Sequence, residues 1–349
     1  MRNADARLGG WDVKQERVNQ EQIDQQRPAG TPACVLELSS SETDALWAAL
    51  GRLVDRELAS LTPDEFADLA LDVAMILPPA VRRRIIDFRR RAPEGDVLLL
   101  RGLIPRDAEV PPTVASSSAL PRGDTVERAS LLLVGVSLLL GEPFNYASLW
   151  DGRLVQNLIP VPGKEFTQTS QSSTGTLDWH VEDGFRLDRC DYAALLCLRG
   201  DPSGASLYAQ AKDLQLPAEL EATLRQERFQ LIPDPAHVLT GEVQPRRIAV
   251  LTGPESQPEI CYDTHHISAI DPADTDASDA LIRLHDHINR VHMAHYMEKG
   301  DLLMFDNRRV VHARSPFAAR FDGTDRWLIR TMICASAVRF RRWGQRIPH

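Results

Sequence analysis

The chain has 349 residues, of which 43% are hydrophobic and 26% are charged. This length allows one large domain or two of ordinary size, and the apolar content is sufficient for a substantial core. The formal net charge of −9 argues against a nucleic-acid partner, because proteins bind phosphate backbones through basic surfaces.

Residues 1–33 are polar and rich in glutamine, and no hydrophobic period runs through them. We predict a mobile or surface-strapping arm there, followed by a single domain over residues 34–349. The arm lacks the apolar stretch of a signal peptide, and the five scattered cysteines show no CxxC spacing. Both observations predict a cytoplasmic protein.

Helical patterns follow the arm. One predicted helix begins at a Ser40 or Ser41 cap, and a second begins at Thr62 with a proline in its first turn. Residues 95–104 form a short apolar run bounded by Gly and Pro, which predicts a buried strand. The leucine-rich run over residues 131–141 is about half of the ~20 residues that a membrane helix requires, so we predict a buried helix and no membrane contact.

From about Ser148 onward the chain alternates short apolar runs with Gly, Pro and Asp. Many short strands separated by turn signals are typical of a sandwich or barrel. One long helical pattern, residues 278–299, interrupts the strands and ends at Gly300. The predicted fold class is therefore mainly β with a helical layer (α+β), the helices of the N-terminal half packing on a β-core.

The stretch TLDWHVEDGF carries the chemistry of a metal site. On a strand, His180 and Glu182 project from one face while Trp179 points to the other. Two histidines and one carboxylate are the ligand set of non-haem Fe(II) oxygenases, so a third ligand is needed. The best candidate is His312, in an apolar strand after a turn.

The helical pattern of residues 278–299 offers a competing site. His292 and His295 are three residues apart on it and could share a metal ion. No carboxylate or cysteine completes that set, so a half-buried stripe of hydrogen-bonded histidines is the favoured interpretation, and the role of this helix stays open.

Two arginines lie after His312 in the chain, and they share one face of a later predicted strand. Arg326 lies fourteen residues after His312, and Arg330 lies four residues further. Arginine binds carboxylates through a bidentate fork, so the pair predicts a site for carboxylate groups.

This arrangement resembles the clavaminate synthase-like Fe(II)/2-oxoglutarate-dependent oxygenases, and especially the bacterial hydroxylases of free L-arginine and related amino acids. The resemblance runs from about Leu46 to the C-terminus and rests on an ordered set of segments: GDVLLLRGL, LGEPFNYA, LVQNLIPV, WHVEDGF, DYAALLCLRG, YDTHH and DNRRVVHARSPF. It implies a double-stranded β-helix, the jelly-roll core also found in cupins.

The resemblance also implies roles for single residues. Fe(II) would be held by His180, Glu182 and His312, with O₂ as the oxidant. The co-substrate 2-oxoglutarate would be bound by Arg326 and Ser206, although relatives carry two threonines where this chain has Ser206 and Leu207. The amino-acid substrate would be bound by five residues: Ser170, Gln168, Glu182, Asp263 and Arg330.

The implied reaction is hydroxylation of an unactivated carbon, C3 or C4, of a free L-amino acid in natural-product (antibiotic) biosynthesis. Retention of Glu182 favours a hydroxylase over related halogenases, in which a small residue replaces the carboxylate. Arginine hydroxylases carry an acidic pair near Asp263, whereas this chain has Thr264 and His265 beside it. Arginine or a near isostere, citrulline or lysine, is therefore preferred to an asparagine-like substrate.

Two alternatives remain open. A non-catalytic cupin-type sensor or binding module could use the same metal ligands, and so could a zinc hydrolase. A sensor has no need of the Arg326 and Arg330 pair. A hydrolase needs a general base beside the water, and Asp183 is predicted to point to the opposite face of the strand from Glu182. The oligomeric state stays open.

Overall fold

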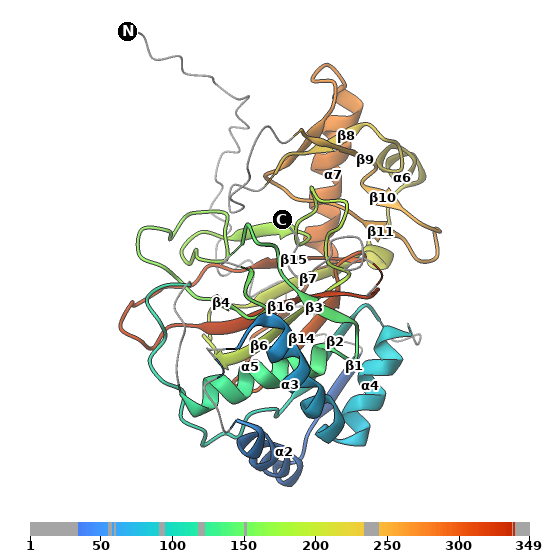
Figure 1. The fold of residues 1–349 in the computed structure, drawn as a ribbon. Helices are drawn as coiled ribbons and strands as arrows, with labels where there is room; N and C mark the ends of the chain where they lie inside the picture. The colour runs from blue at the N-terminus through green and yellow to red at the C-terminus, as the bar shows by residue number, and fades with distance from the viewer. Residues whose placement is uncertain are drawn as a thin grey trace.

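The computed structural model describes residues 34–54, 58, 61–90, 95–117, 123–149, 152–233, 244–336 and 338. Two β-sheets face one another across a buried interior (Figure 1). The seven-stranded sheet has the order β1 (Cys34–Glu37), β2 (Val97–Arg101), β14 (Leu302–Asp306), β6 (Tyr192–Arg199), β16 (Trp327–Cys334) and β3 (Glu142–Phe144), with β4 (Gln156–Leu158) also paired to β16. The four-stranded sheet has the order β13 (Met293–His295), β7 (Ser206–Gln210), β15 (Val310–Arg314) and β5 (Leu177–His180).

The seven-stranded sheet is buried on both faces, which explains the continuous apolar runs of its strands. In β2, Leu98 and Leu100 face the helices, while Val97 and Leu99 face the four-stranded sheet. Strands β14 and β6 alternate in the same way. Because both faces need apolar side chains, the sequence of each strand shows no polar alternation.

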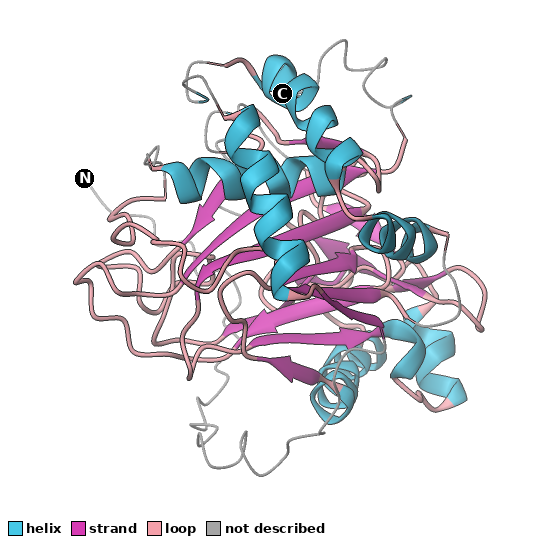
Figure 2. Ribbon diagram, turned by 90° about the horizontal axis from the view of Figure 1, so that it is seen from below, coloured by secondary structure: helices cyan, strands magenta, loops and turns pink. Residues whose placement is uncertain are grey.

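Four helices cover the outer face of the seven-stranded sheet (Figure 2). They are α2 (Ser40–Leu53), α3 (Pro63–Ile76), α4 (Pro79–Arg89) and α5 (Asp124–Ser137). Thr62 caps α3 as predicted, in a capping box with Glu65. The cap of α2 is Ser39 rather than Ser40 or Ser41, because Ser39 forms the equivalent box with Glu42.

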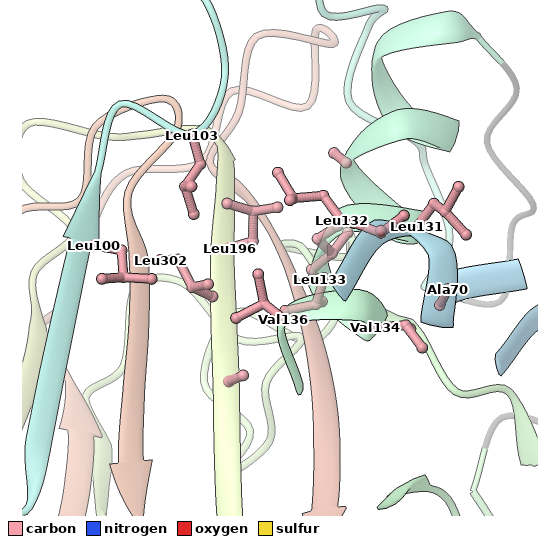
Figure 3. Close-up of a cluster of buried hydrophobic side chains, with 14 of the residues drawn as sticks. Ala70, Leu100, Leu103, Leu131, Leu132, Leu133, Val134, Val136, Leu196 and Leu302 are labelled. Carbon is pink, nitrogen blue, oxygen red and sulfur yellow. The ribbon is translucent and has the colours of Figure 1, made fainter. Parts of the chain in front are cut away.

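The packing of α5 on the sheet forms the largest part of the core (Figure 3). Leu133 of α5 and Leu196 of β6 are fully buried in this cluster, together with Leu302 of β14. Mutations that leave a cavity among such side chains cost both the transfer free energy of the lost atoms and the energy of the void. These contacts between α5 and the sheet attach the helical layer to the β-core.

Leu133→Ala is expected to lower the free energy of unfolding by about 2–5 kcal/mol, because the fully buried side chain leaves a cavity. Urea unfolding followed by tryptophan fluorescence measures this change. Leu71→Ala on α3, where the residue is 51% exposed, should change the free energy by less than about 0.5 kcal/mol. Equal, small effects of the two substitutions would contradict this assignment of the core.

The four-stranded sheet packs its outer face against a second helical and β layer. Trp179 and Val311 lie on that face and contact α7 (Thr275–Val291) and α6 (Ala218–Leu224). The same layer contains the strands β12 (Ile267–Ala269), β8 (Phe229–Leu231) and β9 (Arg246–Ile248), with the β10 (Leu251–Thr252) and β11 (Glu259–Ile260) hairpin. The inner face, which looks toward the seven-stranded sheet, carries the side chains of the site.

The predicted jelly-roll core with its helical layer is confirmed. The predicted helix over residues 278–299 is confirmed as far as Val291 and is wrong beyond that residue. Helix α7 ends at Val291, and His292 adopts an extended conformation. The next residues pair with β7 as strand β13, in which His295 faces Ser206 across the ladder. His295 is buried and bonds the carboxylate of Asp301 through its Nε2 at 2.9 Å. It therefore cannot share a metal ion with His292.

Two further predictions concern an N-terminal arm and the absence of a membrane-spanning helix. The predicted arm over residues 1–33 lies outside the described residues. Among the helices that the structure describes, none combines the length and the apolarity that crossing a bilayer requires.

Candidate active site

A cavity of about 760 Å³ opens between the two sheets at one end of the interior. Its walls come from β5, β7 and β15 of the four-stranded sheet and from β16 of the seven-stranded sheet. The loop of residues 164–171 and the segment of residues 263–266 complete the lining. Every residue that the sequence analysis selected for the site lines this cavity: Gln168, Ser170, His180, Glu182, Ser206, Asp263, His312, Arg326 and Arg330.

Three candidate metal ligands converge in the cavity. His180 ends β5 and lies directly opposite His312 of β15 in the ladder. One ligand atom from each of His180, Glu182 and His312 lies within 4.8 Å of the others, and 3.3 Å separates His312 Nε2 from Glu182 Oε1. Neighbouring ligands around an octahedral ion with bonds of about 2.1 Å are about 3 Å apart. The spacing therefore fits a common metal ion.

The local geometry differs from the predicted pleat. Strand β5 ends at His180, so Glu182 lies in the following turn rather than on the strand. Asp183 adopts a left-handed conformation there, with φ of 53°. It also lines the cavity, and the prediction that it points away from the site is wrong. The turn, and not the alternation of a strand, brings Glu182 back toward the two imidazoles.

The three side chains present suitable ligand atoms for a metal ion. The Nδ1 atom of His180 lies 2.7 Å from the backbone carbonyl of Asp178, which leaves Nε2 as the ligand atom. Burial, together with the neighbouring His180, lowers the pKa of His312 to about 4. Burial raises the pKa of Glu182, but the Arg330 guanidinium and His312 lower it more, and the net pKa lies well below the usual value. Two imidazoles and one carboxylate are the donor set that suits Fe(II).

Asn307 holds the turn that carries Glu182, and the sequence analysis missed this role. Its side-chain Nδ2 donates to the backbone carbonyls of Glu182 and Cys190, and its Oδ1 accepts the Glu182 N–H at 2.8 Å. Asn307 is fully buried. The sequence marks it only as a turn residue after β14, because its partners are more than a hundred residues away.

Asn307→Ala is expected to weaken Fe(II) binding about 10- to 100-fold, the range for losing an outer partner of a metal ligand. The backbone of Glu182 would lose both of its bonds to this side chain. Competition between the protein and a chromogenic chelator measures the affinity. Asn145→Ala is the matched control, since Asn145 is also buried but bonds the carbonyls of Leu149 and Arg153. Equal losses of iron affinity would contradict the role of Asn307.

Arg330 forms hydrogen bonds with Glu182, one of the candidate metal ligands, and with Gln156. Its Nη1 donates to Glu182 Oε1 at 2.5 Å, and its Nε and Nη2 donate to Gln156 Oε1. Gln156 of β4 is fully buried and was not selected from the sequence, where it is one polar residue in an apolar run. Gln156 fixes the plane of the guanidinium, and Arg330 in turn orients the carboxylate of Glu182.

Arg326 forms a separate cationic site deeper in the cavity. Its Nη2 donates to Ser206 Oγ at 3.0 Å, and burial lowers its pKa from the ordinary value. Burial and the charge of Arg326 lower the pKa of Arg314 to about 9. Among the described residues neither arginine forms an ion pair, so the two cations share a region that lacks a bound carboxylate. Such a region suits the carboxylate of a ligand.

Arg314 is a second residue that the sequence analysis did not select. Its Nη1 donates to the carbonyl of Ser173, and its Nη2 donates to Ser172 Oγ and to the carbonyl of Gly175. These contacts hold the loop that carries Ser170 against β15. The loop is thereby fixed to the strand that also carries His312, one of the candidate metal ligands.

The remaining candidate residues lie near β5. The amide of Gln168 donates to the carbonyl of Thr176 and accepts the N–H of Asp178, so it ties the loop to the strand. Asp263 forms a β-bridge with His180. Burial raises the pKa of Asp263, but the contact with His266, the neighbouring His180 and the N–H of His265 together lower it more, so the net pKa lies below the usual value.

Comparison with known proteins agrees with this geometry. Residues 136–332 match the family described as taurine catabolism dioxygenase TauD, TfdA family. The chain is 31% identical to the enduracididine beta-hydroxylase of Streptomyces hygroscopicus, over 85% of this chain and 93% of that protein. It is 34% identical to the L-asparagine oxygenase of Streptomyces coelicolor, over 79% of this chain and 82% of that protein.

Solved structures show the same fold. The non-heme iron oxygenase OrfP in complex with Fe and alpha-ketoglutaric acid superposes with a TM-score of 0.81 at 29% identity, over 92% of this chain and 100% of that chain. OrfP has also been solved with Fe, succinate and (3S)-hydroxy-L-Arg. The resemblance read from the sequence is confirmed, and the chain belongs to the TauD/TfdA family of Fe(II)/2-oxoglutarate-dependent oxygenases.

Proposed function

We propose that this enzyme hydroxylates C3 or C4 of a free L-amino acid with a basic side chain or a near isostere: arginine, citrulline or lysine. One observation carries the proposal. The His180, Glu182 and His312 cluster and the Arg326 cationic site line the same cavity. A metal ion and a dicarboxylate can therefore be bound side by side in it.

The metal and the co-substrate account for the chemistry. When bound, Fe(II) with 2-oxoglutarate and O₂ supplies the oxidant for C–H hydroxylation, with release of succinate and CO₂. His180, Glu182 and His312 would hold the ion on one side and leave its other positions open. Arg326 and Ser206 would bind the far carboxylate of 2-oxoglutarate, since their 3.0 Å contact forms one donor pair.

The amino-acid end of the substrate would be recognised by groups around Glu182. Arg330 and Ser170 would bind the α-carboxylate, and Glu182 would accept the α-ammonium through the oxygen that Arg330 does not hold. Gln156 supports this arrangement by fixing the Arg330 guanidinium, and Gln168 supports it by holding the strand end. Asp263 would face the distal end of the side chain.

The alternatives are disfavoured by the same residues. A sensor or a zinc hydrolase has no use for the buried Arg326 and Ser206 pair, whereas a 2-oxoglutarate oxygenase requires such a site. We assign residues 34–349 to one oxygenase domain, because β1 and β2 belong to the same sheet as β16. The similarity to an enduracididine beta-hydroxylase and to an L-asparagine oxygenase supports natural-product biosynthesis as part of the proposal.

Succinate release tests the proposed function. The protein with Fe(II), 2-oxoglutarate and air is assayed against a panel of free amino acids that includes arginine, lysine, ornithine, citrulline and asparagine. We expect one class of amino acid to stimulate succinate release and to gain about 16 mass units, the mass of one oxygen atom. No stimulation by any member, or turnover without 2-oxoglutarate, would contradict the proposal.

A further inference from the structure

Two carboxylates flank the far end of the cavity, and the pairing of two segments places them there. Strand β5 runs antiparallel to the segment around Asp263, with His180 and Asp263 directly opposite and backbone hydrogen bonds on both sides of this bridge. Two residues earlier on β5, the Asp178 carboxylate contacts the imidazole of His265, which lies in the turn after Asp263. Asp178 and His180 are two residues apart on a strand and so share a face, and all four residues line the cavity.

Each carboxylate is held by its own histidine. His265 Nε2 lies 2.7 Å from Asp178 Oδ2, and His266 Nδ1 lies 3.0 Å from Asp263 Oδ1. The backbone N–H groups of His265 and His266 also donate to Asp263 Oδ1. Within the described part of the chain, all of these contacts use one oxygen of each carboxylate. The other oxygen of each is available to a ligand.

The two carboxylates lack a permanent cationic partner. Among the described residues, Asp178 and Asp263 form ion pairs only with these imidazoles, and neither contacts an arginine or a lysine. Their side chains are 30% and 20% exposed, so both are partly removed from water. Partly desolvated carboxylates without a fixed counter-ion favour a cationic ligand.

We propose that Asp178 supplies, with Asp263, the second carboxylate of a site for the cationic distal group of the substrate side chain, a guanidinium or an ammonium. This inference rests on the proposed function and names its substrate class. Diagonal neighbours on paired strands are about 7 Å apart, a span that a guanidinium bonded on two edges bridges. Asp178 lies about 6.6 Å along β5 from His180, so the cation is held well beyond the carbon at the metal.

The position of Asp178 also favours substrates with a long side chain. A side chain whose polar group follows directly after C3, as in asparagine, would end near His180 and would not reach Asp178. A side chain with three or more atoms beyond C3 would reach it. Asp178 is therefore a specificity-determining residue, and His265 positions it through the 2.7 Å contact.

Asp178→Asn tests the proposal, because it keeps the size of the side chain and its hydrogen bond with His265 while removing the charge. We expect kcat/KM for the preferred cationic amino acid to fall about 10- to 100-fold, as for loss of a hydrogen bond between charged groups. The value for neutral citrulline should change less than about threefold. Anaerobic calorimetric titration of each amino acid into the Fe(II) and 2-oxoglutarate complex should show the same split in affinity.

Control variants show whether an effect of Asp178→Asn is specific to this carboxylate. Asp213→Asn removes an exposed carboxylate that bonds Gln210 and should leave both substrates unaffected. If Asp178→Asn does not fold, Asp178→Glu moves the charge by one carbon and should change the ranking of arginine, ornithine and lysine. An unchanged ranking, or an equal loss for cationic and neutral substrates, would overturn the role of Asp178.

The outcome for the wild-type enzyme distinguishes the two levels of inference. A preference for asparagine, with succinate release intact, would overturn the cation site and leave the oxygenase function standing. Failure of every amino acid to stimulate succinate release would overturn the proposed function, and the cation site with it.

Discussion

Replacing Glu182 with alanine is expected to reduce amino-acid hydroxylation by more than about 100-fold, which exceeds the usual effect of losing an outer partner of a metal site. Glu182 supplies the only carboxylate of the three converging ligands, and its ionised state is maintained by Arg330. Two neutral imidazoles alone hold a divalent cation weakly. Measuring Fe(II) affinity by chelator competition, and succinate release in parallel, connects the loss of turnover with the loss of metal.

Stability must be separated from metal binding in this experiment. Removing Glu182 breaks its buried ion pair with Arg330, and breaking such a pair costs about 3–5 kcal/mol. Glu182→Gln retains the shape and a hydrogen bond to Arg330 but removes the charge. It should fold more stably than the alanine variant and still bind Fe(II) poorly. Normal iron affinity in both variants would refute the assignment of Glu182 as a ligand.

Arg326→Ala is expected to weaken 2-oxoglutarate binding by about 100- to 4000-fold. A buried arginine that forms a charge-assisted pair with a carboxylate contributes about 3–5 kcal/mol when one partner is removed, and each 1.4 kcal/mol corresponds to a factor of ten. Ser206 would lose the guanidinium that shares its side of the cavity. Anaerobic titration of 2-oxoglutarate into the Fe(II)-loaded protein measures the affinity directly.

The neighbouring Arg320 provides the matched control for Arg326. Its side chain is 52% exposed and lies 4.0 Å from Asp322, outside the cavity. Arg320→Ala should leave the affinity for 2-oxoglutarate unchanged within about twofold, since exposed pairs contribute little. If Arg326→Ala binds 2-oxoglutarate normally but loses affinity for the amino acid, the assignment of Arg326 to the co-substrate is wrong.

The architecture was largely predictable because its signals are local. The apolar runs that predicted buried strands are those of β2, β6, β14 and β16, and the proline after Thr62 marked the start of α3. The end of the helix predicted over residues 278–299 was placed too far along the chain, and the reason is physical. A helical pattern records which side chains are apolar, whereas the edge of β7 decides that Met293–His295 form a strand.

The candidate metal ligands could also be selected from the sequence, because two imidazoles and one carboxylate are a ligand set typical of non-haem iron sites. The structure brings these three side chains together. The sequence did not show how Glu182 reaches the site. The pleat argument placed it on a strand, but a turn with Asp183 in a left-handed conformation carries it there.

The sequence by itself determined which residue types can bind iron and carboxylates, and where the strands that bear them begin. Only the tertiary structure showed that Asn307 holds Glu182, that Gln156 holds Arg330, and that Asp178 and Asp263 line the same cavity. The first two contacts join residues 125 and 174 positions apart. Hydrogen bonds of this kind depend on the register of paired strands, and no local pattern of side chains records that register.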